Sequence, residues 1–433
     1  MFKKYSASAL VIVSIASFSV AAVNFDNPKA GRLADEINNI AIDIPIPGKA
    51  EKRKAATVKE WTIMVFVNGR NNLEENALKD INEMEMVGSS DQVNIVVQVA
   101  RIAGYNSSDG DWETSRRYFI TKDDNVDRIS SPVLLDLGKV DMGDYRNVIA
   151  FGKWAKAAYP ARKAMLIIWD HGTGWVKSKE FSGGGKGISY DAEARNHINT
   201  PQIAAILKGI GGVDVYGSDA CLMQMAEVVY EIKDHVKFIV GSEEASPGDG
   251  YPYNSFLAQL VAKPGMGGEA LARLAVEAYA NYYQANGEGS TQSYVRSSAI
   301  PGFLNAVNDL ASAITMADEK DLAGKARGAA QAYRDTDNKD LYHFAQLIAA
   351  GTNDASVKEK SLALMAYMEK ELIGYNRANN GSGGSYWLPP VNHLNSHGLS
   401  IYLPSSVPAS GYEDLQWAKY SNWDEFIKWY QAP

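Results

Sequence analysis

Cysteine is almost absent from this sequence, whose 433 residues include a single one, Cys221. One cysteine excludes an internal disulfide and any metal centre built from several thiolates. Three roles remain for Cys221: a buried small apolar residue, a link to another chain, or a reactive thiol. Burial is the common fate of a free cysteine, so the surrounding residues have to decide between them.

Histidine and basic charge are also scarce. The acidic stretches 123–127 and 335–340 lack an EF-hand pattern, and solvated loops with a helix cap at Asp340 explain them better. A net charge of −8 argues against a nucleic-acid partner; it could attract basic substrates, but a contribution to solubility explains it more simply. No HExxH motif is present, and five of the six histidines are too scattered to nominate a zinc site: His197, His235, His343, His393 and His397.

The N-terminus carries the signature of an export signal. Residues 1–22 place Lys3 and Lys4 before an apolar run that ends in small residues, which is typical of a secretory signal peptide and too short for a comfortable membrane span. No cysteine lies in the expected cleavage region, which argues against a lipid anchor. We expect an exported protein, periplasmic or secreted, with no stable membrane span after signal removal. Residues 23–59 contain proline and a basic cluster and are expected to form a pro-segment or linker.

The rest of the chain alternates short apolar runs with segments of helical periodicity, which predicts an α/β fold. The pattern indicates a largely parallel sheet flanked by helices on both faces. We expect residues 60–265 to form the catalytic part and residues 266–433 a mostly helical region that completes the same unit. Strands are predicted at 61–67, 93–99, 116–120, 164–170, 213–217, 236–240 and 398–403, and the first helices at 73–84 and 144–158.

Cys221 and His171 both follow predicted strands. In VDVYGSDACLMQMAEVVYEI, residues 213–232, the apolar strand is followed by Leu222, Met225 and Val229 at helical spacing, so we expect a helix to begin directly behind Cys221. The amides and dipole of such a helix would favour a thiolate. His171 ends the run AMLIIWD, and the ends of parallel strands share one sheet edge. A lone histidine there is more often structural, but its glycine-rich surroundings and the cysteine block favour a catalytic pair.

Two motifs carry a family resemblance. WDHGTGW around His171 and SDACLMQMAEVVYEI around Cys221 resemble the signature blocks of the clostripain family of cysteine peptidases, which belongs with caspases, gingipains and legumains. WTIMVFVNGRNNLE, SEEASPGDGYPY and HGLSIYLP support the resemblance, which covers roughly residue 60 to the C-terminus. His171 precedes Cys221 by 50 residues, an order and separation similar to those of caspases, although the local caspase signature is absent.

The resemblance implies a caspase-like fold and roles for six residues. Cys221 would be the nucleophile, His171 the proton carrier, and the amides of Gly172 and Cys221 the oxyanion donors. The family cleaves after arginine or lysine, and Asp219 is the expected partner of that basic side chain. A cap for the helix behind Cys221 is the alternative role for Asp219. Ser246 and Asp249 are further candidates for the same pocket, although the Pro247-Gly248 turn alone could explain both.

Activation and calcium are further implications of the resemblance. Basic residues between the two blocks are expected self-cleavage sites: Lys177, Lys179, Lys186 and Arg195. No cofactor is expected, except that some family members depend on calcium, which the sequence leaves open. The expected partners are proteins or peptides with arginine or lysine before the scissile bond. The alternatives are a peptidase of other specificity on the same fold, or a non-catalytic exported binding module, which the 23 tyrosines and 9 tryptophans would suit.

Overall fold

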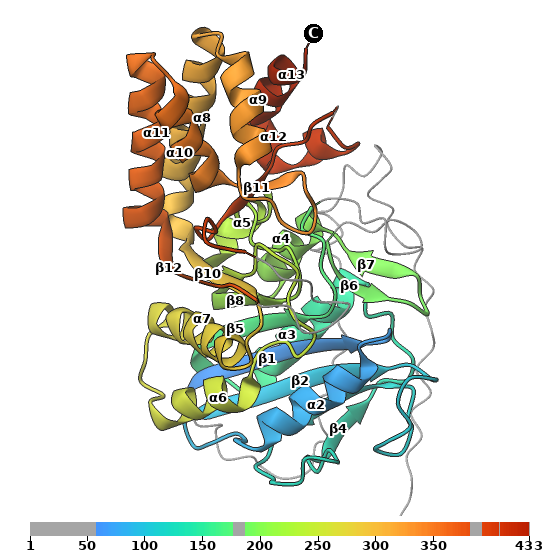
Figure 1. Ribbon diagram of the computed structural model, residues 1–433. Coiled ribbons are helices and arrows are strands. Elements are labelled where there is room, and N and C mark those ends of the chain that lie inside the picture. The colour runs from blue at the N-terminus through green and yellow to red at the C-terminus, as the bar shows by residue number, and fades with distance from the viewer. Residues whose placement is uncertain (1–57, 176–186, 382–391, 407, 433) are drawn as a thin grey trace, which may run out of the picture.

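The computed structural model describes residues 58–175, 187–381, 392–406 and 408–432, and its centre is a nine-stranded sheet (Figure 1). The order across the sheet is β12-β10-β9-β8-β5-β1-β2-β3-β4. The five middle strands run parallel to one another. Each of the two strands at either end of the sheet pairs antiparallel with the strand before it in the order from the centre. The strands are β1 Lys59–Gly69, β2 Val93–Arg101, β3 Ser115–Phe119, β4 Val133–Asp136, β5 Ala161–Trp169, β8 Val213–Asp219, β9 Val236–Gly241, β10 Ser290–Arg296 and β12 Ile373–Asn379.

The middle strands form because their sequences are largely apolar. Every residue of β2 is buried, as are residues 61–69 of β1. A strand that is covered on both faces needs such a run, whereas a half-exposed strand alternates. The predicted α/β class and its largely parallel sheet are therefore confirmed.

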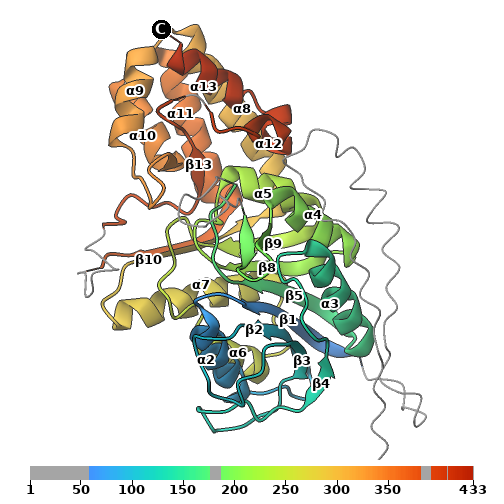
Figure 2. The same cartoon turned by 90° about the vertical axis from the view of Figure 1, so that its right-hand side faces the viewer.

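Helices cover both faces of this sheet (Figure 2). One face carries α2 Glu74–Glu85, α6 Tyr253–Ala262 and α7 Gly268–Ala285, and the other α3 Tyr145–Ala158, α4 Thr200–Gly209 and α5 Ala226–Ile232. Two separate clusters of buried apolar side chains correspond to the two faces. Asp144 starts α3 by accepting from the amide of Arg146, and Asn199 forms a capping box with Gln202 at the start of α4.

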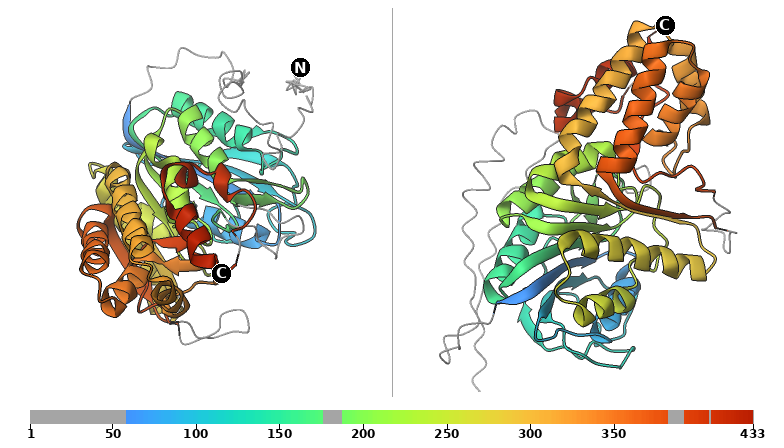
Figure 3. Two further views of the ribbon diagram at one scale, coloured as in Figure 1. Left: turned by 90° about the horizontal axis from the view of Figure 1, so that it is seen from above. Right: turned by 90° about the vertical axis from the view of Figure 1, so that its left-hand side faces the viewer.

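The C-terminal helices gather at one end of the sheet (Figure 3). They share a core cluster with the α3, α4 and α5 face, and Trp417 meets Tyr230 of α5 edge to face at 5.6 Å. Two strands of this region extend the main sheet, because β10 pairs with β9 and β12 pairs with β10. The helices are α8 Ile300–Met316, α9 Lys320–Ala329, α10 Leu341–Gly351, α11 Ala355–Tyr367, α12 Gln416–Tyr420 and α13 Trp423–Gln431.

Two small sheets complete the fold: β6 Ile188–Asp191 with β7 Asn196–Ile198, and β11 Asn338–Asp340 with β13 Ser400–Tyr402. Asp340 caps α10 by accepting from the amide of His343. Within the described ranges, none of the helices combines the length and apolar character that crossing a bilayer requires. The expected signal peptide and pro-segment lie outside the described residues.

Candidate active site

Strands β5 and β8 bring the histidine and cysteine blocks together. They are parallel neighbours in which Trp169 is paired with Asp219, so His171 and Cys221 each lie two residues beyond the same rung. The amide of Asp170 donates to the carbonyl of Asp219 at 3.2 Å and continues the pairing past the strands. Both residues therefore lie at the carboxyl edge of the sheet, where open α/β folds place ligands.

Gly172 packs directly on the backbone of Cys221. A Cβ added at Gly172 would collide with the carbonyl oxygen of Cys221 and would lie 3.0 Å from the Cβ of Ala220. Real side chains do not approach that closely, so the segment after His171 can lie here only because residue 172 is glycine. The two expected oxyanion donors are thus side by side.

Cys221 lies in a turn and not at the start of a helix. The segment after β8 stays non-helical until α5 begins at Ala226. Leu222 has a φ of 61°, a left-handed conformation that a branched residue adopts only under constraint, and it prevents a helix at this point. The expected helix directly behind Cys221 is therefore wrong, and with it the expected help of helix amides and dipole to a thiolate.

The surroundings of Cys221 favour the neutral thiol. The residue keeps some exposed surface, but its sulfur is desolvated, and this burial raises the pKa of Cys221 to about 11. Hydrogen bonds from the backbone amides of Ser246 and Gly172 oppose the shift; the Ser246 nitrogen lies 3.3 Å from Sγ. The thiol of Cys221 is therefore protonated at neutral pH.

His171 is held by a residue that the sequence did not single out. Its Nε2 lies 2.9 Å from Oδ1 of Asn72, in the turn after β1. With an oxygen as the partner, Nε2 carries the proton and Nδ1 keeps the lone pair that a base needs. The signal for Asn72 is its place in NGRNN directly after an apolar strand.

A buried carboxylate beside His171 ties three segments together. Asp170 accepts from the side-chain amides of Asn68 at 3.1 Å and Asn71 at 2.7 Å, and from the backbone amide of Tyr190. Burial raises the pKa of Asp170 well above its usual range, although these hydrogen bonds oppose the shift. Asp170 thus fixes the ends of β1 and β6 against the segment that carries His171.

Asp219 is buried at the end of β8 and does not cap a helix, so the alternative role for this residue is wrong. Its Oδ2 accepts from the amide of Tyr251 at 3.1 Å and from the hydroxyl of Tyr253 at 2.9 Å. It is 5% exposed, and burial raises its pKa to about 7. Among the described residues, no cation forms a salt bridge with this carboxylate.

Ser246 and Asp249 lie on the loop after β9. Ser246 contacts the thiol through its backbone amide, while its hydroxyl donates to the carbonyl of Ala220 at 3.3 Å. Asp249 forms an ion pair with Lys79 at 2.8 Å and accepts from the hydroxyl of Tyr282 at 2.7 Å. Asp249 therefore already has a cationic partner, in contrast to Asp219.

Comparison with known proteins agrees with this geometry. Residues 65–430 match the model of the clostripain family. This chain belongs to the clostripain family of cysteine peptidases. A curated relative, clostripain of Hathewaya histolytica, is 25% identical over 85% of this chain and 78% of its own length.

Solved structures of the family share the fold. A secreted C11 cysteine protease of Bacteroides thetaiotaomicron, bound to an irreversible peptide inhibitor, superposes with a TM-score of 0.65, at 20% identity over 84% of this chain and all of its own. An inactive zymogen of a C11 protease from Parabacteroides distasonis gives a TM-score of 0.63, at 19% identity over 84% and 99% of the two chains. The identification from the sequence is thereby confirmed.

The expected self-cleavage residues are only partly visible in this peptidase. Lys177, Lys179 and Lys186 lie outside the described residues. Arg195 is exposed at the tip of the hairpin between β6 and β7, with a φ of 55°. An exposed tip is accessible to a protease.

The described part of the chain offers no calcium site. It has no group of three or more histidine, cysteine, aspartate or glutamate side chains that could hold a metal ion. In the loop 123–127, the side chains of Asp123 and Asn125 are satisfied by the amides of Asn125 and Asp127.

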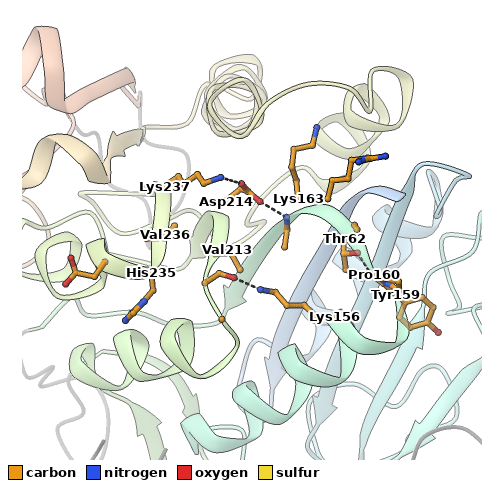
Figure 4. Close-up of a pocket in the computed structure, with 16 residues that line it drawn as sticks. Thr62, Lys156, Tyr159, Pro160, Lys163, Val213, Asp214, His235, Val236 and Lys237 are labelled. Carbon is orange, nitrogen blue, oxygen red and sulfur yellow. Dashed lines mark hydrogen bonds and ion pairs between the residues drawn. The ribbon is translucent and has the colours of Figure 1, made fainter. Parts of the chain in front are cut away.

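A cavity of about 580 Å³ lies at the opposite edge of the sheet, at the amino ends of β1, β5, β8 and β9 (Figure 4). Its cations are already satisfied: Lys156 donates to the carbonyl of Ile210 at 3.0 Å, and Lys237 binds Asp214 at 2.7 Å. It faces away from the edge that carries His171 and Cys221. The chemistry belongs to the carboxyl edge.

Proposed function

We propose that this protein is an exported endopeptidase that cleaves after arginine or lysine, with Cys221 as nucleophile and His171 as proton carrier. The observation that carries the proposal is the shared rung of Trp169 and Asp219, which brings both residues and Gly172 to one point of the sheet edge. Peptide hydrolysis by cysteine needs these three groups: a nucleophile, a group that moves protons, and amide donors.

The reaction would begin from the neutral thiol. As Sγ attacks the scissile carbonyl, the thiol proton passes to Nδ1 of His171, and the amides of Gly172 and Cys221 stabilise the oxyanion. The imidazolium then protonates the leaving amine, and a thioester remains on Cys221. Water, deprotonated by His171, attacks the thioester, and the collapse of the second tetrahedral intermediate releases the acid and restores the thiol. Asn72 would keep Nδ1 turned toward the reacting atoms throughout.

Asp219 would select the basic side chain. A desolvated carboxylate without a cationic partner gains more from a guanidinium or ammonium than a solvated one. Its position two residues before Cys221 supports this role, because a carboxylate there would lie near the substrate residue whose carbonyl is attacked. Export through residues 1–22 and activation by self-cleavage, at Arg195 or the lysines between residues 176 and 186, complete the proposal.

Hydrolysis of matched fluorogenic peptides tests the specificity. Peptides ending in arginine, lysine, aspartate or leucine are compared with the purified protein, Cys221→Ala and Asp219→Asn, with and without calcium. We expect cleavage of the basic pair alone, none by Cys221→Ala, and a loss of at least about tenfold in kcat/KM in Asp219→Asn. Cleavage of a non-basic peptide would still support Cys221 as the nucleophile, but it would rule out Asp219 as the residue that determines specificity. No cleavage at all, even after limited proteolysis, would favour the binding module.

Activation is tested separately on a denaturing gel. The active mature protein is expected to run as two bands, while Cys221→Ala remains a single band. A single intact band for fully active wild-type protein would reject self-cleavage without affecting the specificity.

A further inference from the structure

We propose that Asp80 is a second carboxylate of the substrate pocket and selects arginine over lysine. This inference rests on the proposed specificity for basic residues and names the group that distinguishes the two. Asp80 belongs to α2, far from the histidine and cysteine blocks in sequence, and no motif marks it.

Asp80 and Asp219 converge on Gly250. A Cβ added at Gly250 would lie 3.1 Å from Oδ2 and 3.2 Å from Oδ1 of Asp219, and 3.3 Å from Oδ2 of Asp80. Two carboxylates from different elements, α2 and β8, thus share one small space. Glycine at 250, with a φ of 63°, leaves that space open.

One oxygen of Asp80 has no partner. Its Oδ2 accepts from the indole nitrogen of Trp169 at 2.6 Å, while Oδ1 makes no hydrogen bond within the described structure. The side chain is fully buried, and a buried polar atom without a partner costs roughly 1–3 kcal/mol. Such a cost is explained if a ligand supplies the missing donor.

The charges around Asp80 point to a cationic ligand. Lys79 precedes it, but the ammonium of Lys79 lies 2.8 Å from Asp249 instead. Apart from Lys79, the ionisable groups that face Asp80 are carboxylic acids or phenols: Asp219, Glu83, Tyr253 and Tyr283. Burial and the neighbouring carboxylates raise the pKa of Asp80 well above its usual range, and a bound cation would lower it again.

The depth of Asp80 is what separates arginine from lysine. Asp219 keeps 5% exposure and Asp80 none, so a side chain entering from the sheet edge meets Asp219 first. Arginine is the longer side chain, and its guanidinium presents five N–H donors in a planar fork, enough to bind two carboxylates at once. Lysine offers three donors around a single nitrogen. Lysine would therefore bind Asp219 alone, and arginine both.

The test compares arginine and lysine peptides on three variants. Asp80→Asn is expected to lower kcat/KM for arginine peptides by about ten- to a hundredfold through KM, and for lysine peptides by less than about threefold. Glu227→Gln is the matched control, because Glu227 is also buried, with its pKa raised to about 7, but lies on α5 on the other face of the sheet. It should leave the ratio of arginine to lysine cleavage unchanged. Asp219→Asn should lower both.

The outcomes separate this inference from the proposed function. If the wild-type protein cleaves no basic peptide, or Asp219→Asn still cleaves them normally, the proposed function fails. If Asp219→Asn loses basic cleavage while Asp80→Asn keeps the wild-type ratio, only the role of Asp80 is overturned. An equal loss on arginine and lysine peptides would also overturn it.

A second measurement does not depend on cleavage. Benzamidine, a small amidinium, is titrated into the wild-type protein, Asp80→Asn and Glu227→Gln at pH 7.5, and its affinity is measured by calorimetry. We expect Asp80→Asn to bind benzamidine at least about fivefold more weakly than the wild-type protein does, and Glu227→Gln to bind it equally well. Equal affinity in Asp80→Asn and the wild-type protein would overturn the inference.

Discussion

Oδ1 of Asn72 lies 2.9 Å from Nε2 of His171, so the turn after β1 holds the imidazole that the end of β5 presents. The two strands are parallel neighbours, and their pairing fixes the distance between the turns. The orientation of His171 therefore depends on a residue 99 positions earlier in the chain.

Asn72→Ala should lower kcat by about tenfold with little change in KM, because the imidazole loses the hydrogen bond that orients it. Asn72→Asp should move the acid limb of the pH profile to higher pH, because an added carboxylate favours the imidazolium. Steady-state kinetics between pH 5 and 9 check both. An unshifted profile in Asn72→Asp would contradict the contact.

Gly172→Ala should reduce kcat/KM by more than about a hundredfold, because the added methyl displaces the backbone of Cys221 and with it an oxyanion donor. Gly265→Ala is the control, since a Cβ there would meet nothing within 4 Å. Kinetics and thermal melting of the two variants are compared. Full activity of Gly172→Ala would show that the two segments do not pack as described.

The thiol of Cys221 should react slowly with iodoacetamide at neutral pH in the absence of substrate. Burial raises the pKa of Cys221 to about 11, and the thiolate is the species that is alkylated. The rate should climb steadily up to about pH 11, measured by mass spectrometry with Cys221→Ala as the blank. A rate that is already maximal at pH 7 would mean that the resting enzyme holds a thiolate.

Asp219 should make the fold less stable as pH rises. Burial raises its pKa to about 7, above the roughly 3.9 of an unfolded chain, so the folded state holds this proton more tightly. Its unfavourable contribution is absent below about pH 4, grows as pH rises toward 7 and is complete above it. Asp219→Asn should therefore melt higher than the wild-type protein at pH 8, with a smaller difference at pH 5. Equal melting temperatures at pH 8 would contradict the shift.

The sequence predicts best what depends on continuous apolar runs. Such runs made β1 and β5 predictable, because burial on both faces demands them, whereas the alternation of Val213, Val215 and Gly217 indicated β8. Polar composition hid β10 and β12, whose sequences STQSYVR and IGYNRAN become strands through pairing with β9 and with each other. Pairing between distant segments is not a local property, so no window of sequence reveals it.

Helical periodicity also gave a wrong prediction next to Cys221. Leu222, Met225 and Val229 have helical spacing, and all three are buried. Only Val229 lies in a helix, because α5 begins at Ala226 and the other two residues precede it. A backbone constraint such as the φ of Leu222 leaves no trace in an apolar pattern. Asp80 did leave a trace in the sequence. It lies between Ala77 and Met84 on the buried side of α2, where an acidic residue is unusual.

The sheet also decides what a cut chain would look like. A break between residues 176 and 186 would leave β1 to β5 on one piece and β6 to β13 on the other, yet β5 and β8 are bonded along five paired residues. The two pieces would stay associated through the pairing of β5 with β8. One piece would carry His171 and the other Cys221. Separation of the two pieces would require denaturant, and neither piece would be active alone. The cut peptidase would be a two-chain enzyme made from a single polypeptide.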